Sequence, residues 1–204
     1  MFKNVAADML GLSDIGAVIK PADYDKVDAD DYVLREEGER IYFLIKSKSD
    51  EYCFTNLGLV HLDGTSATSK RRMLRRFPYL YHQLSDVRLE TAGTVDLDIE
   101  IKFTLGNQSY SIDVGKQYMP ELKKLYKALV KIASIQHENS LYLQYAQTSL
   151  NTAATSLGRS SHGSPADEQF QKINQYVFTW LQNTHKNFAR QDFGEVFARY
   201  GVES

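Results

Sequence analysis

A long and regular hydrophobic repeat occupies the C-terminal half of the chain. Apolar residues recur at alternating spacings of three and four from Leu122 to Leu157, interrupted only by polar Gln136 and Asn139. Such a repeat, averaging about 3.5 residues, keeps one seam of a helix facing a partner helix. A helix of roughly 40 residues is about 60 Å long, more than a domain of this size easily buries. The repeat therefore predicts assembly, between chains or against the chain's own last helix, through a seam that includes Leu129, Ile132, Gln136, Asn139, Leu143, Ala146, Leu150 and Leu157.

The two polar positions in the middle of this repeat have two interpretations. A polar residue in a seam specifies register and oligomeric state at some cost in stability. Alternatively, the seam ends there and a second helix begins with Asn139 or Ser140 as its N-cap. The phase of the repeat is kept across this point, which favours a continuous helix.

Strict alternation of apolar and polar residues marks the N-terminal half. It is clearest from Asp96 to Leu105, where Leu97, Ile99, Ile101 and Phe103 should be buried. One buried face and one wet face indicate an antiparallel sheet. We expect about seven short strands between Tyr32 and Val114, including a hairpin of residues 41–45 and 52–55, which suggests a small barrel or sandwich.

The remaining segments complete the expected order of elements. Residues 2–12 have the spacing of a short amphipathic helix, and residues 21–31 form an acidic surface connection. A helix should begin near Pro120, and Ser164 and Pro165 should cap another after the linker of residues 158–164. A last short helix is expected at residues 193–200.

Two runs in the β region resemble the bacterial pleckstrin-homology (PH) family. They are YCFTNLGLVHLD from Tyr52 to Asp63 and ETAGTVDLDIEI from Glu90 to Ile101. The family tends to carry a "-FTN-RL---D" hairpin and an "-ETAG--DLD-E-" strand, and the resemblance covers roughly residues 10–132. It departs at Gly58, where the family often has a basic residue, so no role of that residue carries over.

The resemblance implies an α+β fold: a PH-like antiparallel seven-stranded barrel or sandwich, capped by a helix and followed by a C-terminal helical extension. That extension is similar to the helical oligomerisation region of some members, which are thought to form ring-like homo-oligomers without enzymatic activity. The expected organisation is an N-terminal helix and acidic connection (1–31), the PH-like domain (32–135) and a helical oligomerisation region (136–204).

Charge and cysteine content narrow the class of protein. The net charge of −2 gives no global argument for nucleic-acid binding, and the single Cys53 cannot form an internal disulfide. The first twenty residues lack the pattern of a secretory signal, and no apolar run reaches the 18 or more residues of a membrane-spanning helix. We therefore expect a soluble, cytoplasmic protein.

Catalytic and metal-binding signatures are not found. Asp96, Asp98 and Glu100 lie two apart on one face of a strand and could hold a metal, but such a row is typical of a solvated face. The five histidines show no metal spacing, and no phosphate-binding loop or nucleophile elbow occurs. We expect no metal, no cofactor and no enzymatic activity.

One dense basic cluster has two interpretations. Basic side chains projecting from a strand can bind phosphate groups, which makes Lys70, Arg71, Arg72, Arg75 and Arg76 candidates for binding anions. Alternatively, they protect an edge strand from aggregation, or pair with the acidic row at residues 96–100.

The sequence thus predicts a non-enzymatic, homo-oligomerising PH-like scaffold or interaction module. The alternative is a module recruited to anionic phospholipid, or to another phosphate ligand, through residues 70–76.

Overall fold

The computed structural model describes residues 15–64, 72–91, 98–160, 166–190 and 192–202. The chain divides into two compact units. The β unit comprises residues 1–134 and 191–204, and the hairpin unit comprises residues 135–190. The expected helix at residues 2–12 lies outside the described residues.

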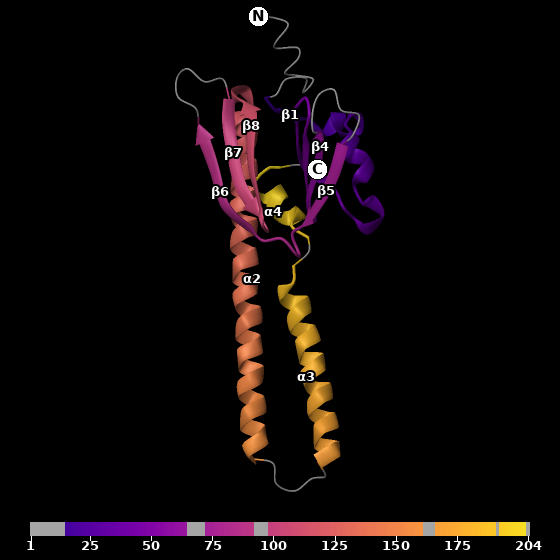
Figure 1. The fold of residues 1–204 in the computed structure, drawn as a ribbon, viewed down its shortest axis with the longest axis vertical. Coiled ribbons are helices and arrows are strands. Elements are labelled where there is room, and N and C mark those ends of the chain that lie inside the picture. Colours follow the sequence, from indigo (N-terminus) through magenta and orange to yellow (C-terminus); the bar gives the residue numbers. More distant parts are fainter. Residues whose placement is uncertain (1–14, 65–71, 92–97, 161–165, 191, 203–204) are drawn as a thin grey trace, which may run out of the picture. The chain divides into compact units, whose positions relative to one another are not determined.

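Two antiparallel sheets form the β unit (Figure 1). They join where Gly16 bridges to Val114 and its N–H donates to the Asp113 carbonyl at 2.7 Å. The five-stranded sheet has the order β1 (Ala17–Ile19), β2 (Ile41–Lys46), β3 (Glu51–Thr55), β4 (Gly58–Gly64) and β5 (Arg72–Pro78). The three-stranded sheet has the order β6 (Leu84–Thr91), β7 (Asp98–Leu105) and β8 (Gln108–Gly115).

Alternation along β7 is confirmed. Ile99, Ile101 and Phe103 are buried, whereas the polar residues between them are half-buried. Leu97 and Asp96 lie outside the described residues. The expected start of the β region near Tyr32 is wrong, because Tyr32 ends a 3₁₀ helix and the next strand begins at Ile41.

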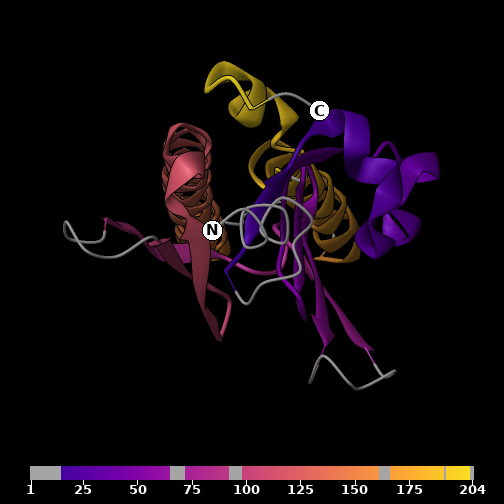
Figure 2. The same ribbon diagram turned by 90° about the horizontal axis from the view of Figure 1, so that it is seen from above.

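The acidic segment before β2 covers one face of the five-stranded sheet. It forms three short 3₁₀ helices, η1 (Pro21–Lys26), η2 (Asp28–Tyr32) and η3 (Arg35–Glu37). Ala29 is fully buried between them and the sheet, in a cluster with Val27, Val33, Leu44 and Val60. Figure 2 shows these helices on the side that faces away from the three-stranded sheet. The segment is therefore more than the surface connection expected from its charge.

A single helix, α2 (Met119–Ser160), follows the last strand and the short η4 (Lys116–Tyr118). Its first turns belong to the β unit, where Leu122, Leu125, Leu129 and Ile132 are fully buried. The helix continues through Asn139 and Ser140, and the Ser140 hydroxyl donates to the His137 carbonyl at 2.7 Å instead of capping a new helix. Of the two interpretations of the polar positions, the continuous helix is the one observed.

The chain then forms α3 (Ala166–Phe188) and α4 (Gly194–Arg199). Helix α3 belongs to the hairpin unit together with α2 from Ile135 onward, whereas α4 packs into the β unit. The last helix is thus present close to its expected position, but it completes the core of the first unit.

Candidate self-association surface

Helices α2 and α3 lie side by side in the hairpin unit (Figure 1). The rings of Tyr142 and Phe188 are in contact, with centroids 5.0 Å apart. Between the helices is a groove of about 390 Å³, lined by Leu143, Ala146, Gln147, Leu181, Gln182, Thr184 and His185. Ala146 is the smallest of these lining residues.

Burial along the hydrophobic seam changes where α2 enters the hairpin unit. Leu129 and Ile132 are fully buried, but Leu143, Ala146 and Leu150 are only half-buried. The polar seam residues Gln136 and Asn139 are also half-buried, and the Leu157 side chain lies outside what the structure describes. The residue pattern is the same on both sides of this change. Burial differs because, in the hairpin unit, one partner helix covers only part of the seam.

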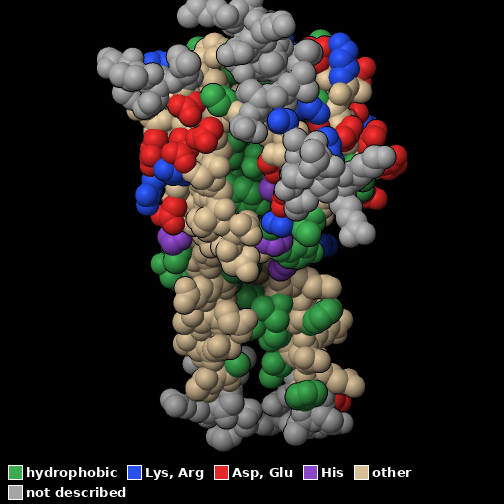
Figure 3. All heavy atoms as spheres, turned by 45° about the horizontal axis from the view of Figure 1, so that its top comes forward, with side chains coloured by type: hydrophobic (Ala, Val, Ile, Leu, Met, Phe, Trp, Pro, Cys, Tyr) green, Lys and Arg blue, Asp and Glu red, His purple; other side chains and the backbone are tan. Residues whose placement is uncertain are grey.

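Large apolar side chains remain exposed on the hairpin unit, and Figure 3 shows hydrophobic groups on its surface. Phe170 and Tyr176 are each 71% exposed, Tyr145 62% and Phe178 61%. We call Tyr145, Phe170, Ile173, Tyr176 and Phe178 the hairpin aromatic surface. Single exposed hydrophobic residues are normal on a protein surface, and it is the number of them on these two helices that makes this surface a candidate for self-association.

The hairpin aromatic surface faces more than one direction. Tyr176 and Phe178 are two positions apart on α3, so their side chains point about 200° apart around the helix axis. Val177, between them in sequence, is half-buried, and it lies about one helical turn before Leu181, which lines the groove between α2 and α3. Helix α3 therefore presents an exposed aromatic ring on each flank of its contact with α2.

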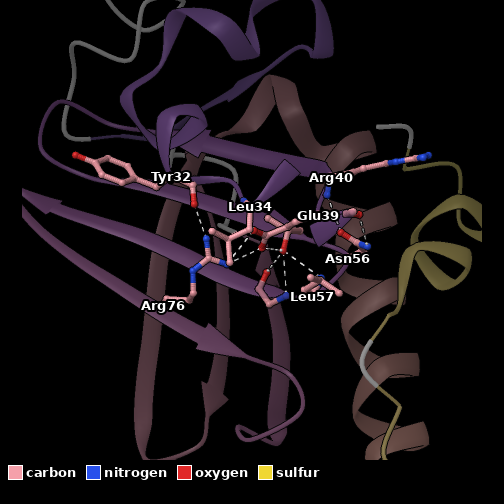
Figure 4. A network of polar contacts seen from close by, with 10 residues as sticks. Tyr32, Leu34, Glu39, Arg40, Asn56, Leu57 and Arg76 are labelled. Carbon is pink, nitrogen blue, oxygen red and sulfur yellow. Dashed lines mark hydrogen bonds and ion pairs between the residues drawn. The ribbon is translucent and has the colours of Figure 1, made fainter. Parts of the chain in front are cut away.

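The basic strand β5 is the outer strand of its sheet among the described strands, as expected for a charged edge. Its residue Arg76 enters a buried polar network (Figure 4). Arg76 Nη1 lies 2.8 and 2.9 Å from the two carboxylate oxygens of Glu39, and Nη2 donates to the Tyr32 carbonyl. Glu39 is only 2% exposed and also accepts hydrogen bonds from the Thr55 hydroxyl and the Leu34 N–H, each at 2.7 Å.

The other described arginines of β5 also have carboxylate partners. Arg72 pairs with Asp28 and lies 3.5 Å from Glu51, and Arg75 Nη2 lies 3.1 Å from Asp63. These partners lie on η2, β3 and β4, so the pairing expected with the acidic row on β7 is wrong for the described residues. Lys70 and Arg71 lie outside them.

The acidic row has local partners of its own. Lys102 Nζ lies 2.8 Å from Glu100, and the Ser111 hydroxyl donates to the same carboxylate. These hydrogen bonds hold the pKa of Glu100 below its usual value. The neighbouring Asp113 carboxyl has a raised pKa, caused first by burial and then by repulsion from Glu100 and Asp98. On this face the Glu100 carboxylate is thus compensated by Lys102 and Ser111, whereas the charged form of Asp113 is disfavoured.

Metal-binding side chains do not gather in the described residues. No group of three His, Cys, Asp or Glu side chains in that part of the chain could hold a metal ion. Cys53 is fully buried, and this burial raises the pKa of its thiol, which keeps it protonated. No helix among the described residues is long and apolar enough to cross a membrane.

Sequence reasoning missed the buried carboxylates Glu39 and Glu51 and the docking of α4. Glu51 accepts a hydrogen bond from the Ala29 N–H at 2.7 Å and pairs with Lys46, so it fastens η2 to the sheet. Apolar Val27, Ala29 and Val33 among the acidic residues were the available signal that this segment packs on a sheet.

Comparison with known proteins agrees with this architecture. Residues 9–133 match the family model for the bacterial PH domain, and residues 144–201 match that for the YvbH-like oligomerisation region. A Bacillus subtilis (strain 168) protein, "Uncharacterized protein YvbH", is 52% identical over 202 residues, which is 98% of each chain. The crystal structure of a PH-domain-containing protein from Exiguobacterium sibiricum 255-15 superposes with a TM-score of 0.85 at 50% identity, covering 91% of this chain and 98% of that one.

Two antiparallel sheets closed by a C-terminal helix define a PH-like fold, and the hairpin is the extension added to it. The chain belongs to the bacterial PH-domain family and carries a YvbH-like oligomerisation region. The α+β fold and the family resemblance drawn from residues 52–63 and 90–101 are confirmed.

Proposed function

We propose that the protein is a non-enzymatic, homo-oligomerising scaffold in which hairpin units associate and hold several β units together. The observation that carries this proposal is the exposure of the hairpin aromatic surface within the region that matches a family of oligomerisation regions. The half-buried seam of Leu143, Ala146 and Leu150 supports it, because further helices would complete the burial of those residues.

The hydrophobic gain from association is substantial. Full burial of one Phe or Leu side chain contributes roughly 1.5–3 kcal/mol. Five members of the hairpin aromatic surface are exposed at once, in a hairpin with no fully buried residue among those described between Ile135 and Arg190. Helical bundles reach stability by surrounding a shared core with more than two helices.

The position of the aromatic rings favours a closed assembly with several copies. Since Tyr176 and Phe178 lie on opposite flanks of α3, a hairpin can contact one neighbour through each flank. Contacts between two different surfaces propagate from copy to copy and close into a ring when the rotation between copies permits. A two-fold dimer formed through one flank alone would leave the other flank uncovered.

Recruitment to anionic phospholipid through residues 70–76 is the competing hypothesis. Arg72, Arg75 and Arg76 each have a carboxylate partner, which indicates that these side chains stabilise the β unit. An arginine already paired with a buried carboxylate such as Glu39 would lose that pair on turning toward a phosphate.

Light scattering coupled to gel filtration on the full chain tests the scaffold. We expect a mass of several times 23.3 kDa that persists on dilution. Replacing Tyr176 and Phe178 together by Ser should lower that mass, whereas Tyr81→Ser, at a 76% exposed position of the β unit, serves as the matched control. A wild-type protein that elutes as a monomer at all concentrations would refute the proposal.

A further inference from the structure

The C-terminal segment, residues 192–202, is docked in a groove of the β unit. Phe193 and Phe197 are fully buried, and Val196 and Val202 nearly so. The Phe193 ring meets Tyr79 edge-on at 5.5 Å, and the Phe197 ring stacks on Tyr42 at 5.1 Å. A helix of six residues is too short to be stable alone, so this packing must hold it in place.

Polar contacts fix the segment at both of its ends. At the start, the Phe193 N–H donates to the Asn56 carbonyl at 2.9 Å, and Asn56 Nδ2 donates to Asp192 at 2.8 Å. At the end, Lys124 Nζ donates to the Gly201 carbonyl at 3.0 Å. Asn56 is itself held by the Arg40 N–H at 2.7 Å (Figure 4).

The groove is also selective for the shape of its occupant. A Cβ atom at Gly194 would lie 2.6 Å from the Tyr42 hydroxyl, so the backbone approaches that ring too closely for a larger residue. The N–H of Gly194 instead donates to Asp192 Oδ1 at 2.7 Å. The groove thus recognises an Asp-Phe-Gly start followed by a second Phe four positions after the first.

This docked segment belongs to two regions at once. By its contacts it is part of the β unit, yet the match to the oligomerisation region extends to residue 201. It follows the whole hairpin unit in the chain, and Asn56 and Asp192 are 136 positions apart. The residues that fill the groove therefore belong largely to the region that matches the family of oligomerisation regions.

We propose that this groove is an exchangeable docking site, and that in the assembly it receives residues 192–202 from a second copy of the chain. The inference rests on the proposed self-association of the hairpin units. Exchange of an identical segment preserves every contact of the docked segment and needs no new surface. Association of several copies also raises the effective concentration of one copy's segment around the groove of another.

Cross-linking of mixed chains tests the exchange. Two full-length proteins with different tags are prepared, both with Cys53→Ala. One carries Lys124→Cys, in the groove, and the other carries Tyr200→Cys, beside Gly201. They are unfolded, mixed in equal amounts, refolded and treated with a short bismaleimide. If segments are exchanged, covalent dimers that carry both tags should form. After random mixing, roughly half of the grooves with Lys124→Cys should receive a segment with Tyr200→Cys. Lys48→Cys, at an exposed position in the β2–β3 turn, replaces Lys124→Cys in the control and should give none.

A chain carrying both Lys124→Cys and Tyr200→Cys completes the design. If it closes within one chain, and mixed populations of normal oligomeric mass give no two-tag dimer, the exchange is refuted while the scaffold stands. If light scattering shows monomers, the scaffold itself fails and the exchange fails with it. Should Tyr200→Cys disturb folding, Arg199→Cys replaces it, because Arg199 is exposed at the end of α4.

Discussion

Arg76 and Glu39 form an ion pair in which one guanidinium nitrogen lies within 2.9 Å of both carboxylate oxygens. The pair joins the edge strand β5 to a residue two positions before the start of β2, 37 positions earlier in the chain. Arg76 belongs to the densest basic cluster of the sequence, and its side chain links two elements within the β unit.

Removing one partner of this pair should destabilise the protein strongly. In Arg76→Ala the Glu39 carboxylate stays buried without its counter-charge, which costs on the order of 3 kcal/mol. Urea denaturation would show a lower midpoint with an unchanged slope. Arg88→Ala, whose side chain is 66% exposed beside Asp86, is the control and should change the free energy of unfolding by less than about 0.5 kcal/mol. Equal midpoints for the two variants would contradict the structural role.

Binding to anionic vesicles should not depend on the described arginines of β5. We expect the wild type and Arg72→Ala with Arg75→Ala to co-sediment with phosphatidylserine vesicles to the same small extent at low and high salt. If the strand recruits lipid, each basic residue contributes about 1 kcal/mol, and the double change would weaken binding by roughly 30-fold. Strong, salt-sensitive binding that this variant loses would favour the recruitment hypothesis.

A charge in the helical seam should weaken the assembly. Leu143 is half-buried beside the groove between α2 and α3, and Leu143→Asp would place a carboxylate where neighbouring helices exclude water. We expect a lower mass by light scattering, or new proteolytic cleavage within the hairpin unit. Ser149→Asp adds the same charge at an exposed position of the same helix and should leave both unchanged.

The β2–β3 turn should contribute a pH-dependent term to stability. Burial of the Asp50 carboxyl opposes its ionisation, but hydrogen bonds from His61 and Ser49 outweigh that effect, so its pKa is lowered. A carboxyl with a lowered pKa in the folded state stabilises the protein above its ordinary pKa near 3.9 and loses that contribution as pH falls through the folded value.

Melting temperatures from pH 6 downward would measure this term. Asp50→Asn should be less stable than the wild type at pH 6, and the difference should shrink below pH 4. Ser49→Ala removes one of the two hydrogen bonds to Asp50, and its stability at pH 6 should lie between those of the wild type and Asp50→Asn. A difference that stays constant with pH would show that Asp50 acts through packing alone.

The docked C-terminal segment should be required for the stability of the β unit. Phe197→Ala removes a fully buried ring that stacks on Tyr42, and the cavity should cost about 3–5 kcal/mol. Phe178→Ala, at an exposed position, should leave the unfolding of the β unit unchanged while weakening the assembly. Urea unfolding reports the loss of stability, and light scattering without urea reports the mass of the assembly, so the two measurements together separate the two effects.

Local patterns predicted the elements whose burial follows a simple period. The alternation from Ile99 to Leu105 and the seam from Leu122 to Ile132 are buried as the sequence indicates. The pattern could not show that Leu129 and Leu143 differ in burial, because the residues of one helix do not determine how many other elements pack around it.

Long-range polar contacts could not be predicted, for a different reason. A buried Glu39 is stable only because Arg76, Thr55 and the Leu34 N–H reach it from other elements, and no local period encodes such a meeting. In the same way, the acidic character of residues 21–31 concealed the buried Ala29.

The split of the β unit between two distant parts of the sequence has a consequence for the order of synthesis. A ribosome produces the whole hairpin before it produces Phe193 and Phe197, so the core of the β unit can be completed only after both hairpin helices have been synthesised. Folding proceeds from the N-terminus as the chain emerges. The residues before the hairpin can therefore fold early, but their groove is filled only once residues 192–202 have been made.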